Sequence, residues 1–289
     1  MLRIALPNKG RLSEDALELF ADAGLDARKA GDRALTASLG GEMQALFLRA
    51  QDIPEFIADG AADAGVTGWD CVLESGRDLT SALDLGFGAC QLVVAVREHF
   101  PAAALTDIPA GTRVATPFPR ITRDFFTTRG IPVEVVPLSG AAEVAPLLGI
   151  ADVVVDLTST GSTLRANQLR VIDTVVGSSA RLVSTPAAVN AMRAGTGKAL
   201  GDLTLALDSV LRARGKRYVM ANVPRAVLDA VKRVLPGLNG PTVIDLLNGG
   251  SMVAVHAVVE SGALYRTIGE LKSLGAEGVL VTRIERLVP

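Results

Sequence analysis

The chain has 289 residues, of which 49% are hydrophobic and 21% are charged. This is ordinary globular usage and provides enough chain for two or three domains. The 29 basic and 31 acidic residues nearly balance, at a net charge of −2, which argues against nucleic acid or a membrane surface as a partner. The two cysteines and two histidines show neither disulfide nor zinc-site spacing, so we expect no metal site built from protein side chains alone.

The first third of the chain alternates between strand and helix patterns. Leu2–Leu6 reads as a short apolar strand, and a helix is expected to begin at Ser13, a good N-cap residue. Strands at Met43–Leu48 and Ala64–Thr67 flank a short helix at Pro54–Asp59, with proline at its first position. This alternation predicts an α/β arrangement with a mainly parallel sheet.

A second α/β unit begins near Gln91. Its expected strands are Leu92–Val96, Arg113–Ala115, Val133–Val136 and the continuous apolar run Val153–Leu157, and its expected helices are Ile121–Arg129 and Ala141–Leu148. From about Ala180 the chain is expected to return to the first unit. We therefore predict one lobe from residues 1–90 with 179–213, a second lobe from 91–178, and a ligand cleft between them. This plan resembles the type II periplasmic binding proteins.

The last part of the chain, residues 214–289, predicts a separate small domain. Its pattern is strand, helix, two strands, helix and strand, the ferredoxin-like βαββαβ order, over Tyr218–Val223, Arg225–Leu235, Thr242–Leu247, Met252–Val259, Leu264–Leu274 and Gly278–Ile284. The N-terminus shows no leader-peptide pattern, and no run of 18 apolar residues occurs. We therefore expect a cytoplasmic protein without a membrane span.

The segment Asp152–Asn167 carries the clearest chemical signal. Its apolar strand ends in Asp156, and the hydroxyl-rich loop Ser159-Thr160-Gly161-Ser162-Thr163 follows, with a helix expected near Ser162 or Thr163. Backbone N–H groups and hydroxyls at a helix start can hold a phosphate, and glycine lets it approach closely. The alternative is a Ser/Thr-rich turn that only caps the helix.

A wider set of motifs extends this signal along the chain. Glu143, Gly149, Asp152, Asp156 and Ser159–Leu164 together resemble the signature of the ATP phosphoribosyltransferases. Further segments that resemble this family are Pro7–Leu12, Arg49–Pro54, Asp63–Asp70, Leu238–Thr242 and Leu274–Ala276. The resemblance of the last two segments implies the long form of the family, with a C-terminal regulatory domain and no separate regulatory subunit.

The resemblance assigns roles to two acidic residues and to the loop. Glu143 and Asp156 would hold the ribose hydroxyls of phosphoribosyl pyrophosphate, because carboxylates accept hydrogen bonds from hydroxyl pairs. Ser159, Thr160, Gly161, Ser162 and Thr163 would hold its 5′-phosphate. Glu143 alone could instead be a helix-terminal charge.

Basic and polar residues of the first unit would complete the substrate site. Lys9, Arg11 and Arg49, with Arg33 as a weaker candidate, would bind the pyrophosphate or the ATP phosphates. Any single arginine could instead be a solvated surface charge. Thr67, Gly68 and Asp70 follow a strand and are expected to face the same cleft, although Asp70 could cap a local turn.

The resemblance implies that adenine N1 of ATP displaces pyrophosphate from phosphoribosyl pyrophosphate. Neutral N1 has a free lone pair, so no strong base is needed, and positioning and charge stabilisation would carry catalysis. Mg²⁺ is expected on the pyrophosphate, held largely by substrate oxygens and water. The rival readings are a two-lobed solute-binding protein, an inactive regulatory subunit, and a phosphoribosyltransferase for another base.

The C-terminal domain is expected, by the same resemblance, to bind histidine as a feedback inhibitor. Leu238 and Thr242 match the family's L-x-x-P-T segment, and Gly240 between them could leave room for the ligand. Asn222 and Gly278 are positional guesses. The resemblance also implies a homo-oligomer, a hexamer built from dimers.

Overall fold

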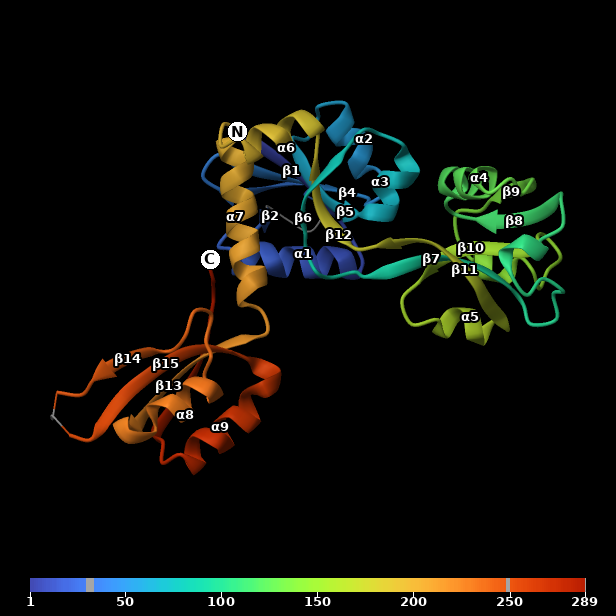
Figure 1. Cartoon of the computed structure of the whole chain (residues 1–289). Helices are drawn as coiled ribbons and strands as arrows, with labels where there is room; N and C mark the ends of the chain where they lie inside the picture. Colours follow the sequence, from blue (N-terminus) through green and yellow to red (C-terminus); the bar gives the residue numbers. More distant parts are fainter. Residues whose placement is uncertain (30–33, 248–249, 289) are drawn as a thin grey trace. The chain divides into compact units, whose positions relative to one another are not determined.

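The computed structural model describes residues 1–29, 34–247 and 250–288 and divides into two compact units, Met1–Thr204 and Leu205–Pro289 (Figure 1). Strands of the first unit form two separate sheets, and strands of the second unit form a third. We call the part of the first unit built on the first sheet lobe I, and the part built on the second sheet lobe II. The expected fold class, a two-lobed α/β core followed by a ferredoxin-like domain, is confirmed.

The sheet of lobe I is mixed rather than mainly parallel. In spatial order its strands are β2 (Arg28–Lys29), β3 (Thr36–Gly40), β4 (Met43–Leu48), β1 (Leu2–Pro7), β5 (Ala64–Gly68), β12 (Ala180–Ser184) and β6 (Thr80–Asp84). The adjacent strands β4, β1 and β5 are parallel, whereas the outer pairs are antiparallel. The expectation of a mainly parallel sheet was wrong for β3 because only Gly41 and Glu42 separate it from β4, and such a short turn joins antiparallel strands.

Three helices of lobe I, α1 (Arg11–Asp22), α2 (Ile53–Ala58) and α3 (Trp69–Ser75), each follow one of its parallel strands. Two more follow β12, namely α6 (Pro186–Arg193) and the first part of α7 (Lys198–Ala213), which continues into the second unit. The expected start of α1 at Ser13 was wrong, because Gly10 stands at the N-cap with φ 77°. A backbone turn at that angle favours glycine. It starts the helix two residues earlier, so Ser13 is buried inside it and Arg11 occupies its first turn.

The sheet of lobe II has a buried apolar core. In spatial order its strands are β11 (Leu169–Ser178), β7 (Cys90–Arg97), β10 (Val153–Thr158), β8 (Thr112–Thr116) and β9 (Val133–Pro137). Val153, Val154 and Val155 are fully buried, as their continuous apolar pattern predicted. The helical elements are η1 (Leu105–Asp107), α4 (Pro119–Thr128), η2 (Ala142–Val144) and α5 (Ser162–Ala166).

The helix expected at Ala141–Leu148 is only the single 3₁₀ turn η2. Pro146 lies in the middle of that segment, and proline lacks the N–H that would continue a helical ladder. Ala141 itself has φ 52°, outside the helical region. Glu143 is therefore held in a short turn rather than at the start of a longer helix.

The chain passes between the two lobes at two neighbouring places. It leaves lobe I between β6 and β7 and returns between β11 and β12. β7 and β11 pair antiparallel, and Cys90 lies opposite Ser178 at that end of the pair. We call this region the crossover; here the two lobes are covalently joined.

The second unit contains the third sheet, in the spatial order β14 (Thr242–Asp245), β15 (Met252–Glu260), β13 (Lys216–Pro224) and β16 (Glu277–Arg283). Its helical elements are η3 (Arg225–Val227), α8 (Leu228–Val234), η4 (Ser261–Ala263) and α9 (Leu264–Ser273). All its strand pairs are antiparallel, and the predicted βαββαβ order is confirmed. Val219, Ala221 and Val223 are buried in the core with α8 and α9, while alternate residues point to the other face.

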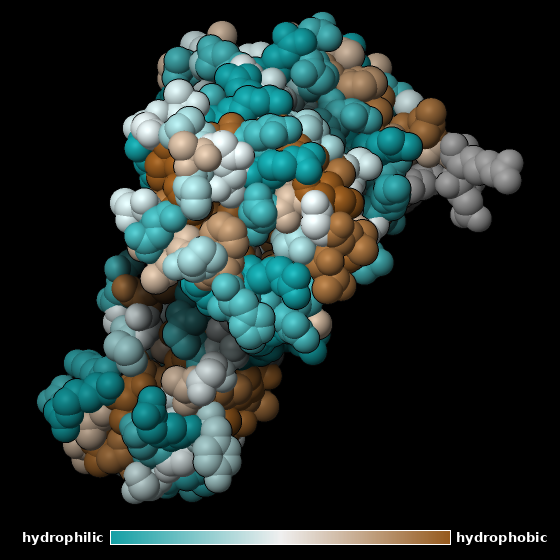
Figure 2. Space-filling model, turned by 90° about the vertical axis from the view of Figure 1, so that its right-hand side faces the viewer, coloured by the Kyte–Doolittle hydropathy of each residue, from teal (hydrophilic) through white to brown (hydrophobic). Residues whose placement is uncertain are grey.

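The outer strands of the third sheet expose apolar side chains. Val243 and Ile244 of β14 and Leu280 and Val281 of β16 are exposed, as is Leu238, which precedes β14. Figure 2 shows one face of the molecule, on which hydrophobic residues stand in separate groups among hydrophilic ones. Along the described part of the chain, no helix combines the length and the apolar character that crossing a bilayer requires.

Candidate functional site

Glu143 and Asp156, the two carboxylates predicted to bind ribose, lie close together in lobe II. Asp156 follows the buried valines of β10, and Glu143 lies in η2; both are half-buried. Burial raises the pKa of Asp156, the Leu157 N–H that donates to its Oδ1 at 2.7 Å opposes this, and the neighbouring Glu143 charge raises it further. Two carboxylates in this arrangement favour a ligand that donates hydrogen bonds or carries positive charge.

The loop after β10 exposes hydroxyl groups beside a glycine turn. Gly161 has φ 71°, and its N–H donates to Thr158 Oγ1 at 2.9 Å. The hydroxyls of Thr160 and Ser162 lie 3.0 Å apart, and α5 begins at Ser162 as predicted. The side chains exposed to solvent in this loop are Ser159, Thr160, Ser162 and Thr163.

The sequence analysis did not identify two residues that lie beside this loop, Thr158 and Arg165. Thr158 fixes the turn through its hydroxyl, and Arg165 lies so close that a Cβ on Gly161 would be 2.9 Å from its Nη1. A signal for Arg165 was present, because residues four apart lie on one helical face. Its guanidinium places a positive charge beside the loop predicted to hold a phosphate.

The cations of lobe I emerge from neighbouring strand ends. Lys9 follows β1 and Arg49 follows β4, and these parallel strands pair as far as Pro7 and Leu48. Both side chains are exposed. Arg11, in the first turn of α1, is 92% exposed, and its Nε lies 3.9 Å from Asp15 Oδ2. Arg33, the fourth predicted cation, lies outside the described residues.

Thr67 and Asp70 are buried and already have partners in the chain. The Thr67 hydroxyl donates to the Ala50 carbonyl oxygen at 2.7 Å, which ties the end of β5 to the loop after β4. Asp70 accepts a hydrogen bond from the Ser178 hydroxyl at 2.5 Å. A Cβ on Gly68 would collide with the Asp70 carboxylate, so these side chains fix the local backbone.

A cleft of about 520 Å³ has walls from both lobes. Lobe I contributes residues that include Arg11, Gln51 and Asp70, and lobe II contributes Pro117, Phe118, Ser139 and Leu157. Leu157 follows Asp156 in β10, but neither Asp156 nor Glu143 is among the residues that line this cleft. Phe118 and Ser139 carried no sequence signal, since only the packing of the lobes shows that they face lobe I.

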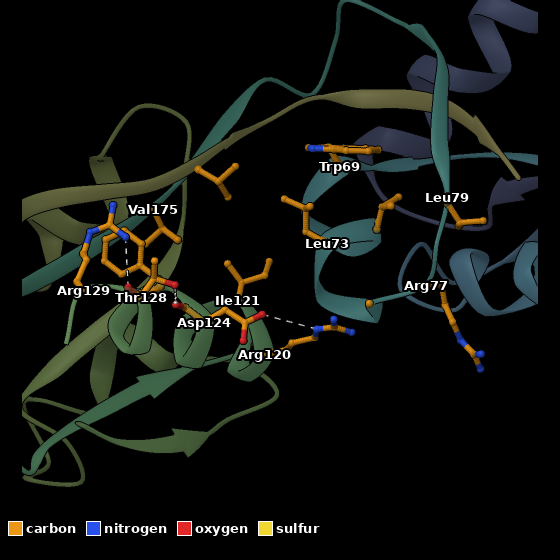
Figure 3. A pocket seen from close by; sticks show the side chains of 14 residues that line it. Trp69, Leu73, Arg77, Leu79, Arg120, Ile121, Asp124, Thr128, Arg129 and Val175 are labelled. Atoms are coloured by element: carbon orange, nitrogen blue, oxygen red, sulfur yellow. Dashed lines mark hydrogen bonds and ion pairs between the residues drawn. The ribbon is translucent and has the colours of Figure 1, made fainter. Parts of the chain in front are cut away.

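A second hollow, of about 500 Å³, lies between α3 and α4. Figure 3 shows Trp69 and Leu73 on one side and Ile121, Asp124 and Arg129 on the other. Of the residues predicted for the site, none is in its lining. The Arg181 guanidinium lies 4.4 Å from the centroid of the Trp69 ring, so this indole is a packing residue.

The cysteines do not supply a nucleophile. Cys71 lines the cleft, but burial, and next the charge of Asp70, raise the pKa of its thiol to about 12. Burial, and then Asp70, raise the pKa of Cys90 as well. Both are free thiols, and the described residues contain no group of three or more metal-binding side chains. At neutral pH these thiols stay protonated and unreactive.

The five residues predicted to bind histidine fall into two groups. Leu238 and Gly240 precede β14, and Thr242 is its first residue, exposed at one edge of the third sheet. Asn222 in β13 and Gly278 in β16 are neighbours, since a Cβ on Gly278 would be 3.7 Å from Asn222 Nδ2. β15 and β13 separate the edge strands β14 and β16, so the chain does not bring the two groups together.

Comparisons with known proteins show the family of the chain. The family model for ATP phosphoribosyltransferase matches residues 49–207, and the model for the HisG C-terminal domain matches residues 213–286. An ATP phosphoribosyltransferase from Gemmatimonas aurantiaca is 65% identical over the whole of both chains. One from Methanocella arvoryzae is 47% identical, also over both full lengths.

A solved structure shares the fold of the larger part of the chain. It is the ATP phosphoribosyl transferase (HisG:HisZ) complex from Thermotoga maritima, with a TM-score of 0.61 and 28% identity. The similarity covers 72% of this chain and 99% of that one.

The two-lobed core with its acid pair and hydroxyl loop, taken with these matches, defines a transferase of the pentosyltransferase class. The chain belongs to the ATP phosphoribosyltransferase family, in the long form that carries the C-terminal domain.

Proposed function

We propose that this chain transfers the phosphoribosyl group of phosphoribosyl pyrophosphate to N1 of the adenine of ATP. The reaction releases pyrophosphate and forms phosphoribosyl-ATP, the first step of histidine biosynthesis. The observation that carries the proposal is the acid pair Glu143 and Asp156 with the hydroxyl loop that follows Asp156, in lobe II, which forms one wall of a cleft whose opposite wall belongs to lobe I. A solute-binding protein requires no such pair beside a phosphate loop.

Each side of the cleft has its own task in this reaction. Asp156 and Glu143 accept hydrogen bonds from the ribose hydroxyls, which offset the cost of holding two charges together. The 5′-phosphate binds at the loop Ser159–Thr163. Lys9, Arg11 and Arg49 bind phosphate oxygens, and they stabilise the charge that develops as pyrophosphate leaves. Arg33 remains a weaker candidate for the same role.

No residue has to remove a proton from adenine N1. Its lone pair attacks the anomeric carbon, and the bond from that carbon to the pyrophosphate oxygen breaks. The two protonated thiols near Asp70 take no part. The rate enhancement comes from holding the two substrates in line. Thr67, Gly68 and Asp70 support this by fixing the wall of the cleft.

We propose that Mg²⁺ enters with the pyrophosphate group. Mg²⁺ retains water and commonly binds through phosphate oxygens and one or two carboxylates. The paired carboxylates Glu143 and Asp156 are hard oxygen donors that fit this preference, and the metal would neutralise charge on the leaving pyrophosphate. Their primary task in the proposal remains the ribose hydroxyls.

We propose three functional parts: residues 1–90 with 179–213, residues 91–178, and residues 214–289 as a regulatory domain. The grouping of strands into three sheets supports this division, although the compact units separate at Thr204, inside α7, rather than at 213. The apolar side chains exposed on β14 and β16 support assembly into a homo-oligomer. Because the chain carries its own C-terminal domain, no separate regulatory subunit is expected.

The direct test mixes the purified protein with ATP, phosphoribosyl pyrophosphate and Mg²⁺ and follows the ultraviolet absorbance of phosphoribosyl-ATP. We expect product formation that histidine suppresses. An increase that histidine leaves unchanged would preserve the enzyme and reject the regulatory role of the C-terminal domain. A protein that binds either substrate but forms no product would instead be a binding protein or an inactive subunit.

A separate variant tests the proposed histidine site in the C-terminal domain. Thr242→Ala removes one hydroxyl from an exposed strand end and should weaken inhibition by histidine without changing the uninhibited rate. Ser251→Ala, at another exposed position of the same unit, is the matched control. Equal inhibition of both variants would move the effector site away from β14.

A further inference from the structure

The helix α4 of lobe II is capped by a side chain from lobe I. The first N–H groups of a helix have no partner inside the helix, and the N-cap residue Phe118 supplies no side-chain hydrogen bond. Instead, the Arg120 N–H donates to Glu74 Oε1 at 2.9 Å, and the Ile121 N–H donates to Glu74 Oε2 at 3.0 Å. Glu74 belongs to α3, so a carboxylate of one lobe satisfies the helix terminus of the other.

The contact between α3 and α4 is reciprocal. Gly76, with φ 65° at the C-cap of α3, lies so close to the Arg120 guanidinium that a Cβ there would collide with it. A negative charge at a helix N-terminus and a positive charge at a helix C-terminus are both favourable. Figure 3 shows the Arg120 side chain, also paired with Asp124 at 3.8 Å, extending toward α3. We call Glu74, Gly76 and Arg120 the clasp.

The clasp is the second of two connections from one helical face. Asp70 and Glu74 are four residues apart on α3, and residues at that spacing lie on the same face. Asp70 bonds to Ser178 at the crossover, and Glu74 bonds to α4. One connection alone would leave a hinge at the crossover. Two connections at separate places fix the angle between the lobes.

The capped end of α4 also forms part of the cleft wall. Pro117 and Phe118 line the cleft, and they immediately precede the helix whose N–H groups Glu74 holds. Asp70, at the other end of the same face of α3, lines the cleft too. A change in the clasp would therefore move a wall that both substrates share.

We propose that Glu74 is a positioning residue that fixes the separation of the two lobes, and with it the alignment of the lobe I cations with the ribose-binding acids of lobe II. Glu74 is not among the residues that line the cleft. This inference rests on the proposed function for the assignment of substrates to the two walls. Misplacement by about 1 Å, at a distance from the reacting atoms, can reduce a rate about 100-fold.

The test uses Glu74→Gln in the full-length chain. The amide retains one acceptor oxygen, but its NH₂ group cannot accept the second N–H bond. Asp78→Asn, an exposed acidic position in the loop after α3, removes the same charge as the control. Hydrogen exchange at the Arg120 and Ile121 amides reads the clasp directly, and kcat with single-substrate Kd values reads its effect on catalysis.

We expect faster exchange at these two amides in Glu74→Gln and a kcat lower by about tenfold or more. The Kd of each substrate alone should change less than about twofold. Glu74→Asp should retain less amide protection and a lower kcat than Glu74→Gln, because its carboxylate is on a shorter side chain. Faster exchange with an unchanged kcat would overturn the positioning role. Unchanged exchange would overturn the clasp itself.

Two further controls keep the outcomes distinct. If Glu74→Gln does not fold, Gly76→Ala displaces Arg120 from the other side of the clasp and should give the same split between kcat and Kd. A wild-type protein without phosphoribosyl-ATP formation would reject the proposed function, whereas the exchange measurement would still report on the clasp.

Discussion

The hydroxyl of Ser178 lies 2.5 Å from Asp70 Oδ1, and it donates a hydrogen bond to this carboxylate. The Ser178 hydroxyl oxygen in turn accepts a hydrogen bond from the Asp70 backbone N–H at 3.0 Å. The two residues are 108 positions apart in the sequence, and both are buried. One hydroxyl thus joins the start of α3 to the strand by which the chain leaves lobe II.

Ser178→Ala should reduce the free energy of unfolding by about 1–3 kcal/mol, because it leaves the buried Asp70 carboxylate with only the weak Cys71 thiol as donor, at 3.5 Å. The fluorescence of Trp69, the single tryptophan, reports unfolding from the residue next to Asp70. Ser251→Ala, at an exposed position, should stay within about 0.5 kcal/mol of the wild type. Equal stability of the two variants would show that Asp70 finds another donor.

The raised pKa of Asp156 predicts a pH-dependent stability. Burial and Glu143 favour the protonated carboxyl in the folded chain, so its contribution is present below its ordinary pKa and lost as the pH rises through the raised value. Asp156→Asn lacks this titration. Its stability relative to the wild type should increase from about pH 4 upward and then level off. Denaturant unfolding across this range measures the difference.

Glu143→Gln separates the two causes of that shift. It removes the neighbouring charge but leaves the burial of Asp156, so the pKa of Asp156 should decrease without reaching its ordinary value. Carboxyl chemical shifts followed through a titration would show the change. An unaltered titration of Asp156 in this variant would mean that the two carboxylates are not coupled.

Gly161→Ala should impair binding of phosphoribosyl pyrophosphate. The glycine has φ 71°, and a Cβ would stand 2.9 Å from Arg165 Nη1. The strained backbone should cost about 1 kcal/mol of stability, and the shifted loop should raise the KM for this substrate about tenfold. Gly177→Ala is the control, since its φ is not positive and a Cβ there meets open space. A KM equal to that of the control would place the phosphate elsewhere.

Arg11→Ala should lower activity while leaving stability nearly unchanged. Its side chain is 92% exposed, with only a 3.9 Å approach to Asp15, and such surface pairs contribute about 0–1 kcal/mol. A lost charge-assisted bond to phosphate should lower kcat/KM by about 10- to 100-fold. Arg113→Ala, which removes a comparable exposed pair with Glu134 at 3.8 Å, should retain full activity. Full activity in both variants would make Arg11 a solvated charge.

The sequence by itself determined the fold class, many of the strands and helices, and the start of α5 after the hydroxyl loop. Val153–Val155 are continuous and apolar, so they had to be a buried strand, and Asp156 at its end had to serve a purpose. The alternating pattern of Lys216–Pro224 and its neighbours determined the ferredoxin-like domain. These are local properties, which the periodicity of apolar residues and the spacing of turn residues indicate.

Other features were decided only by the tertiary structure. Gly10 moved the start of α1 through its positive φ, and Pro146 ended a predicted helix because it lacks an N–H. Helix propensities alone do not predict either effect well. Contacts such as Asp70 with Ser178, Glu74 with α4, and Phe118 in the cleft join residues far apart in sequence. Nothing local specifies such a pairing, because burial and the satisfaction of buried polar groups depend on which surfaces the folded lobes bring together.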